Sequence, residues 1–156
     1  MTYSVEYFGI SFVNGSFRKL EGTVETDNFG VAKTISLRIE AASIDTNQQQ
    51  RDGALRSEHF FDTEKYPAIL GEGSIQGGSV GATVEMKGQR LPFTFPSFRV
   101  SGIITDPDGK QRIGGSTEAT IDRTAWGISG NMTLPDGTPA IAMQVKVRID
   151  AEAIEA

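Results

Sequence analysis

AIAMQVKVRID, residues 140–150, decides the fold class of this chain. Apolar side chains recur at every second position of this stretch, at Ile141, Met143, Val145, Val147 and Ile149. A period of two places these side chains on one face of an extended strand and their polar neighbours on the other. The stretch is therefore predicted to be a strand of an antiparallel sheet, with one face toward a core and the other toward water.

The same alternation recurs along most of the chain, for example in TISLRIE at 34–40, SVGATVEMK at 79–87 and LPFTF at 91–95. Turn sequences rich in Gly, Asn, Asp and Pro separate these runs, because such residues adopt the backbone angles that tight turns need. The pattern predicts about eight strands, near 3–12, 16–26, 31–42, 67–76, 80–88, 91–104, 111–122 and 139–150. Eight antiparallel strands with one apolar face form either a closed barrel or a sandwich, and periodicity alone does not choose between them.

One stretch, residues 45–62, does not follow the strand pattern. It begins with Asp-Thr-Asn at 45–47, and all three residue types cap the N-termini of helices. Tyr-Pro at 66–67 ends the segment, because the residue before a proline disfavours helical angles. We therefore predict one short helix after the third strand, across one end of the sheet.

Length and composition predict a single domain over residues 1–156, long enough to form a core without disulfides. The formal charge of −5 is spread along the chain without a basic block, so nucleic acid is not an expected partner. No apolar run approaches the roughly 20 residues that cross a bilayer as a helix, and no integral membrane segment is predicted. The opening MTYSVEYFGI has no basic start and does not resemble a signal peptide. The chain as written is expected in the cytoplasm, or in the periplasm or outside the cell if its natural start lies upstream.

The sequence contains no motif that predicts catalysis or metal binding. His59 is the only histidine and cysteine is absent, so the usual ligands of a transition-metal site are lacking. Gly-Gly-Ser-Val-Gly at 77–81 has the spacing of a nucleophile elbow, but a predicted strand follows it and His59 precedes it. We therefore predict no catalytic residues, no metal and no enzymatic activity.

The segment SIDTNQQQRDGALRSEHFFDTEKYPAI, residues 43–69, resembles the signature of the YceI family, the lipocalin-like polyisoprenoid-binding proteins. The family's Ser-x-Asp-Thr start, Arg-Asp pair, Leu-Arg-Ser step, Phe-Phe-Asp and Tyr-Pro all occur in order. Two family histidines are replaced, one by Tyr7 in the first strand and one by Ala54 after Arg-Asp-Gly. Any family role that depends on those histidines does not carry over to this chain.

The resemblance implies an all-β fold, an eight-stranded antiparallel lipocalin-like barrel with the short helix beside its mouth. It implies non-enzymatic binding, storage or transport of a long-chain isoprenoid lipid, of the quinone or polyprenyl phosphate type, or of a fatty-acyl lipid. It implies no cofactor other than such a lipid, and it is consistent with a homodimer. The residues expected to line the interior or its mouth are Tyr3, Val5, Tyr7, Leu37, Ile39, Arg51, Leu55, Phe60, Phe61, Met86, Phe93, Phe95, Trp126, Met143 and Val145.

Other interpretations of these residues remain open. Every barrel needs an inward apolar face, so the apolar residues alone fit an ordinary core better than a ligand wall. The alternative function is a structural or protein-interaction domain whose barrel is filled and binds no ligand. Arg51 and Arg123 could contact a lipid headgroup, since guanidinium groups bind phosphate and carbonyl oxygens. Equally, Arg51 and Asp52 could be a structural pair, and Arg123 is better explained as a local anchor.

Overall fold

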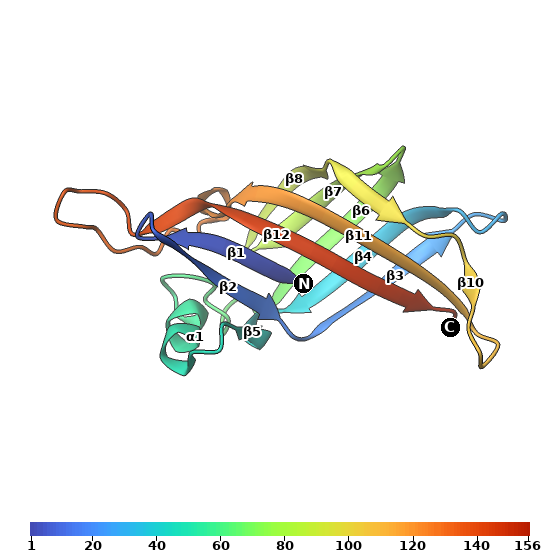
Figure 1. Cartoon of the computed structure of the whole chain (residues 1–156), viewed down its shortest axis with the longest axis horizontal. Helices are drawn as coiled ribbons and strands as arrows, with labels where there is room; N and C mark the ends of the chain where they lie inside the picture. Colours follow the sequence, from blue (N-terminus) through green and yellow to red (C-terminus); the bar gives the residue numbers. More distant parts are fainter.

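A computed structural model describes residues 1–156 as a mainly β chain with one α-helix and two short 3₁₀ helices (Figure 1). The strands form two sheets in which every pairing is antiparallel. Sheet A has the order β10-β11-β12-β1-β2-β5, with β9 also paired to β11. Its strands are β1 Thr2–Tyr7, β2 Ser11–Phe17, β5 Ile44–Asp45, β9 Ser97–Val100, β10 Ile104–Thr105, β11 Gln111–Asp122 and β12 Ile141–Ile154. Sheet B has the order β3-β4-β6-β7-β8, comprising β3 Leu20–Thr26, β4 Ala32–Glu40, β6 Ala68–Gln76, β7 Ser79–Met86 and β8 Gln89–Phe95.

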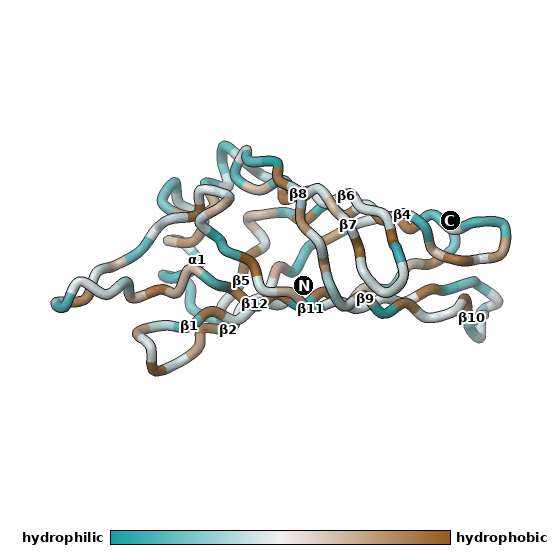
Figure 2. Tube along the Cα trace, turned by 90° about the horizontal axis from the view of Figure 1, so that it is seen from above, coloured by the Kyte–Doolittle hydropathy of each residue, from teal (hydrophilic) through white to brown (hydrophobic).

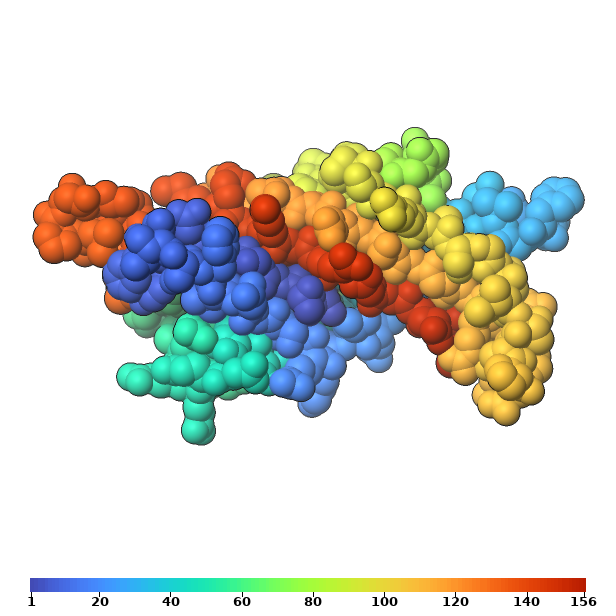
Figure 3. Space-filling view, viewed as in Figure 1, coloured from blue at the N-terminus to red at the C-terminus, as the bar shows by residue number.

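The two sheets face each other across the molecule. In Figure 2, β4, β6, β7 and β8 lie on one side and β9, β11 and β12 lie on the other. The chain passes between the sheets four times. It does so at Arg18–Lys19 between β2 and β3, at Ala41–Ser43 between β4 and β5, through the segment that contains α1 between β5 and β6, and at Pro96 between β8 and β9. The molecule is elongated, and Figure 3 shows the β3–β4 turn and the loop at 129–140 projecting from opposite ends.

The predicted closed eight-stranded barrel is wrong, because neither sheet closes on itself. Pairing between β1 and β12 ends at Thr2 and Arg148, so the last residues of β12 pair only with β11. Strand β3 pairs only with β4, and β8 pairs only with β7. The hydrogen-bond ladder is therefore interrupted at both places where the two sheets meet.

Several predicted strands are also divided. The run at 3–12 contains a turn where Phe8 and Gly9 have positive φ angles of 56° and 68°, which separates β1 from β2. The run at 16–26 bends at Arg18–Lys19, where the backbone N–H groups of both residues bond to Ser43 instead of a strand neighbour. Pro96 has no N–H to give to a ladder and divides the run at 91–104.

The helix α1 spans Gln49–Arg56, inside the predicted segment but after five strands, so its predicted place after the third strand is wrong. Its cap also differs from the prediction. The side chain of Gln48 accepts a hydrogen bond from the Arg51 backbone N–H, while the hydroxyl of Thr46 serves a different contact. Figure 1 shows α1 beside β2 and β5 at one end of the molecule. No helix in the structure combines the length and apolar character needed to span a membrane.

Candidate functional site

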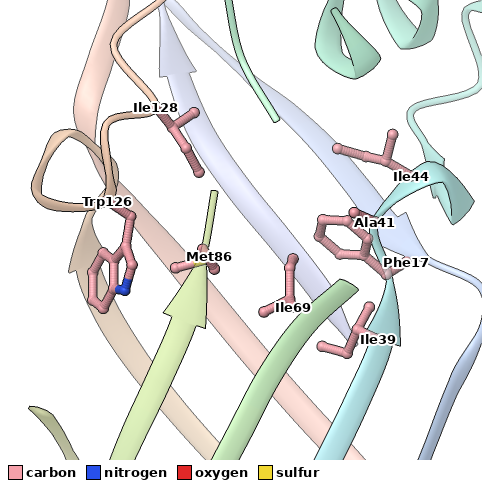
Figure 4. Packing of buried hydrophobic residues seen from close by; sticks show 8 residues of the cluster. All are labelled: Phe17, Ile39, Ala41, Ile44, Ile69, Met86, Trp126 and Ile128. Atoms are coloured by element: carbon pink, nitrogen blue, oxygen red, sulfur yellow. The ribbon is translucent and has the colours of Figure 1, made fainter. Parts of the chain in front are cut away.

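A cluster of buried apolar side chains fills one end of the space between the sheets (Figure 4). We call this cluster the closed-end core, and its members are Phe17, Ile39, Ala41, Ile44, Ile69, Met86, Trp126 and Ile128. Sheet A contributes Phe17 and Ile44, while Ile39, Ile69 and Met86 come from sheet B. The indole N–H of Trp126 donates to the Val84 carbonyl at 3.1 Å, which satisfies the one polar atom of this buried ring.

The end of α1 and the turn that follows it cover the closed-end core. Leu55, Phe60 and Phe61 are half-buried and pack against it. The rings of Phe61 and Phe17 meet edge to face, with 5.5 Å between their centroids. The helical segment that interrupts the strand pattern therefore closes this end of the molecule with apolar side chains.

Val80, Val145 and Val147 are buried outside the closed-end core, whereas many other inward-facing apolar side chains, some of them packed against that core, are half-buried. They follow the same alternation that places Ile39 and Met86 in the core, and they line both sheets. On sheet B they are Leu20, Val24, Ile35, Leu37, Ile75, Leu91, Phe93 and Phe95, and on sheet A they are Val5, Phe98, Ile113 and Ile149. These inward side chains retain accessible surface and are not fully covered by the opposite sheet. We call this half-buried region the apolar space.

The total accessible surface agrees with an incompletely filled interior. The chain exposes 9498 Å², whereas a compact monomer of this mass, 16.8 kDa, exposes about 7,700 Å². Projecting turns account for part of this excess of roughly a quarter. The half-buried inner side chains also contribute to it.

A polar cluster holds α1 against β5 near the closed-end core. The Asp52 carboxylate, 7% exposed, accepts hydrogen bonds from the backbone N–H and the hydroxyl of Thr46, at 2.9 and 2.6 Å. Arg51 donates from Nε to the Thr46 hydroxyl and from Nη2 to the Thr46 carbonyl, at 2.8 and 3.0 Å. Asp52 is therefore a structural anchor. Two of the three guanidinium nitrogens of Arg51 also bind Thr46 and help to hold α1 against β5.

Tyr3 lies on the inner face of sheet A, close to this polar cluster. Its ring packs over Gly15 and lies 6.0 Å from the Phe17 ring between centroids. Burial is the largest cause that raises the pKa of the Tyr3 hydroxyl above its ordinary value, and the nearby Asp52 carboxylate raises it further. No group of the protein forms a hydrogen bond with this buried hydroxyl.

Arg123, the other candidate headgroup contact, is a structural anchor as predicted. The side chain is 6% exposed and donates to four backbone carbonyls, of Ala142, Ile128, Gly130 and Ile141, at 2.6 to 3.2 Å. These bonds fasten the chain after β11 to the start of β12. Burial lowers the pKa of Arg123, and its donors are directed at the backbone and not into the apolar space.

Two hollows on the molecule have a different character. One, of about 440 Å³, lies beside α1 and has a single apolar residue, Ile44, among the ten that line it. The other, of about 520 Å³, lies over the outer face of sheet B and is lined mainly by Gly, Thr and Ser residues. Both are shallow and polar, so neither suits a long apolar ligand.

The predicted site residues fall into three environments. Ile39, Met86, Trp126 and Val145 are buried. Partial burial is shared by a larger group, Tyr3, Val5, Tyr7, Leu37, Arg51, Leu55, Phe60, Phe61, Phe93 and Phe95. Met143 is 50% exposed, because the pairing of β1 with β12 shifts register between Val5 and Tyr7 and leaves Met143 at an irregularity. The structure does not bring Met143 together with the others.

Some inward residues were not predicted. Leu20, Leu91 and Ile149 are half-buried inward residues that were missing from the predicted lining, although the alternation already placed Leu91 and Ile149 on the inward faces of their strands. Thr117 is inward-facing and 8% exposed, on β11. Its position in the alternation was visible in the sequence, but the lack of any partner for its hydroxyl was not.

Comparison with known proteins assigns the fold to a family. The model of the YceI-like domain matches residues 1–153. Two Staphylococcus aureus proteins, UPF0312 protein SA2479 of strain N315 and UPF0312 protein SAV2687 of strain Mu50, are each 30% identical over 156 residues. The alignment with each covers 97% of this chain and 90% of the relative.

Solved structures agree on the fold. The YCEI protein of Campylobacter jejuni superposes with a TM-score of 0.77 at 23% identity, covering 94% of this chain and 87% of that one. Burkholderia cenocepacia BcnA gives a TM-score of 0.78 at 19% identity, covering 97% and 94%. A polyisoprenoid binding domain from Saccharophagus degradans, implicated in plant cell wall breakdown, gives 0.75 at 16% identity, covering 99% and 92%.

Proposed function

This chain belongs to the family of YceI-like domains, and we propose that it binds a long-chain isoprenoid or fatty-acyl lipid in the apolar space between its sheets. The observation that carries the proposal is the half-buried state of many inward apolar side chains on both sheets. A filled core would bury these side chains, whereas a lipid tail would cover them. The similar fold of the polyisoprenoid binding domain of Saccharophagus degradans supports the choice of ligand.

The energetics of an apolar tail suit this role. Each buried CH₂ contributes about 0.8 kcal/mol, so a tail of ~20 carbons contributes roughly 16 kcal/mol before costs. Nanomolar binding requires about 12 kcal/mol. Ordering the tail and fixing its position takes back several kcal/mol. Affinity would therefore come mainly from the tail, and selectivity from the length of the apolar space and its few polar atoms.

The tail is proposed to lie against Leu37, Phe93 and Phe95 of sheet B and Val5 of sheet A. All four side chains are half-buried, and Leu37 and Phe93 also pack against the closed-end core, so a tail would cover the surface that the core leaves exposed. Tyr3 and the remaining nitrogen of Arg51 supply polar groups near the closed end.

The proposed role is carrying or storing the lipid without chemical change. The one histidine, His59, is exposed in the turn after α1, and the buried carboxylate of Asp52 is held by Thr46. Neither is placed as a general base toward a substrate in the apolar space. The proposed cycle is therefore uptake and release, with no catalytic step.

Mass spectrometry of an organic extract tests the proposal on protein purified without detergent and again after incubation with a quinone or a polyprenyl phosphate. Phe93→Glu places a carboxylate among apolar groups and is expected to abolish loading, because an unpaired buried charge is costly. Thr94→Glu is the matched control, since Thr94 is exposed on the opposite face of the same strand. Equal loading of the two folded variants would refute the assigned location. An unloaded wild-type protein after incubation would favour the filled interaction domain.

A further inference from the structure

The hydroxyl of Thr117 is a buried polar group without a hydrogen-bond partner in the protein. Thr117 is 8% exposed, and its Oγ1 bonds to no other group of the chain. A buried hydroxyl that lacks a partner is destabilising, and native proteins retain few of them. The nearly isosteric Val would remove that penalty, so this hydroxyl calls for an explanation other than packing.

Thr117 lies among apolar side chains on the inner face of sheet A. Its cross-strand neighbours are Phe98 on β9 and Ile149 on β12. Gly115 and Ala119 are the adjacent inward positions along β11. Thr117 therefore places a hydrogen-bonding oxygen in the wall of the apolar space, where a lipid tail is proposed to lie.

No charge accompanies this hydroxyl on the inner face. The charged residues of β9, β11 and β12 all occupy outward positions of the alternation, and Glu118 and Arg148 among them pair with each other at 2.8 Å. A neutral hydroxyl does not compensate the desolvation of a phosphate or carboxylate, whereas it can satisfy a carbonyl or alcohol oxygen with one hydrogen bond. The chemistry beside Thr117 therefore fits an uncharged oxygen-bearing group.

Apolar neighbours cover the Thr117 oxygen, so a ligand atom reaches it only if one of them moves. The Phe98 ring is suited to such movement, because it rests against Gly115, which has no side chain, and belongs to a strand of four residues.

We propose that Thr117 determines ligand specificity by hydrogen bonding to an uncharged oxygen, a carbonyl or hydroxyl, of a lipid bound in the apolar space. This inference rests on the proposed lipid-binding function and goes beyond it in naming the residue and the headgroup chemistry. The polar group of the ligand then lies inside the protein, beside β11, and anionic lipids bind less well than neutral ones of the same tail.

Three probes with similar tails test the inference: geranylgeraniol, the hydrocarbon phytane and geranylgeranyl phosphate. Equilibrium binding is measured for the full chain and for Thr117→Val and Thr117→Ser. Thr117→Val is expected to weaken geranylgeraniol binding roughly three- to tenfold, up to about 1.4 kcal/mol, and to leave phytane binding unchanged. Thr117→Ser should restore most of the affinity for the alcohol.

The outcomes distinguish a failure of the proposed Thr117 contact from a failure of the proposed lipid binding. If the wild type binds none of the three probes, the proposed lipid binding itself fails. If the wild type binds phytane and geranylgeraniol but Thr117→Val leaves both affinities unchanged, or lowers both equally, Thr117 is not the anchor. Stronger binding of the phosphate than of the alcohol would refute the uncharged headgroup. Should Thr117→Val fail to fold, Thr117→Ala replaces it in the same comparison.

Discussion

Replacing Arg123 by Met should destabilise the protein strongly while leaving the lining of the apolar space intact. The guanidinium bonds to the carbonyls of Ala142, Ile128, Gly130 and Ile141 at 2.6 to 3.2 Å, and the side chain is 6% exposed. Hydrogen bonds to a charged group contribute about 1.5–3 kcal/mol each, so four of them would total roughly 6–12 kcal/mol if simply added. Two effects reduce this total.

The first reduction is that the guanidinium no longer has to be desolvated once it is removed, a cost of several kcal/mol per buried ion. The second is that Gly130 lies at the partly exposed start of the loop at 129–140, where water can replace a lost donor. Breaking a buried charged network commonly costs about 3–5 kcal/mol, and we expect Arg123→Met to fall in that range.

Urea unfolding followed by circular dichroism measures this change. Arg99→Met is the matched control, because Arg99 is exposed on β9 and the substitution is the same. The control midpoint should be unchanged, as for most surface substitutions. An Arg123→Met midpoint equal to that of the control would refute the structural role. A well-folded Arg123→Met that no longer loads lipid would instead identify Arg123 as a ligand contact.

Two further predictions concern Tyr3. Because the pKa of its hydroxyl is raised in the folded state, the unfolded chain loses this proton first, so stability should fall by about 1.4 kcal/mol per unit as pH rises above about 10. Tyr3→Phe should reduce that fall and leave stability at neutral pH equal or higher, and an identical pH profile for the two proteins would contradict the assignment. Gly15→Ala should destabilise by about 1–3 kcal/mol, since a methyl group there overlaps the Tyr3 ring. The penalty should shrink in a Tyr3→Leu background, and an unchanged penalty in thermal unfolding would show that the ring is not its cause.

The family could be predicted from the sequence because one long segment, residues 43–69, carries its signature, and the family match confirms that prediction. Most strands were predictable as well, since half-buried strands such as β4 and β7 alternate clearly. The turn at Phe8 and Gly9 was missed because apolar residues continue at Ile10 and Phe12 across it.

The closed barrel could not be excluded from periodicity. Barrels and facing sheets both place alternate side chains inward, and they differ only in which edges pair. That difference lies at the sheet edges, where β3 pairs only with β4 and β8 only with β7, and the sequence does not mark which edges stay unpaired. Pro96 was a usable signal for the corner between β8 and β9, because a proline cannot continue a central ladder.

The site was predictable by face but not by degree of burial. Alternation correctly selects Leu37 and Ile39 for the same face of β4, yet one is half-buried and the other is in the closed-end core. Met143 obeys the alternation in sequence, but a shift in register leaves it half-exposed. Burial depends on what the opposite sheet supplies, which is a long-range property that no local pattern contains.

The closed-end core and the apolar space contribute differently to the stability of the fold and to ligand binding. The closed-end core, under the Phe60–Phe61 turn, buries its apolar surface within the protein. The apolar space does not, so side chains such as Leu37 and Phe93 contribute less of their hydrophobic free energy to folding than their size allows. A lipid that covers them adds that free energy to the bound state alone, and by mass action it stabilises the fold in proportion to its affinity. Substitutions in the apolar space should therefore change ligand length and affinity at small cost to the unliganded fold, whereas substitutions in the closed-end core should do the reverse.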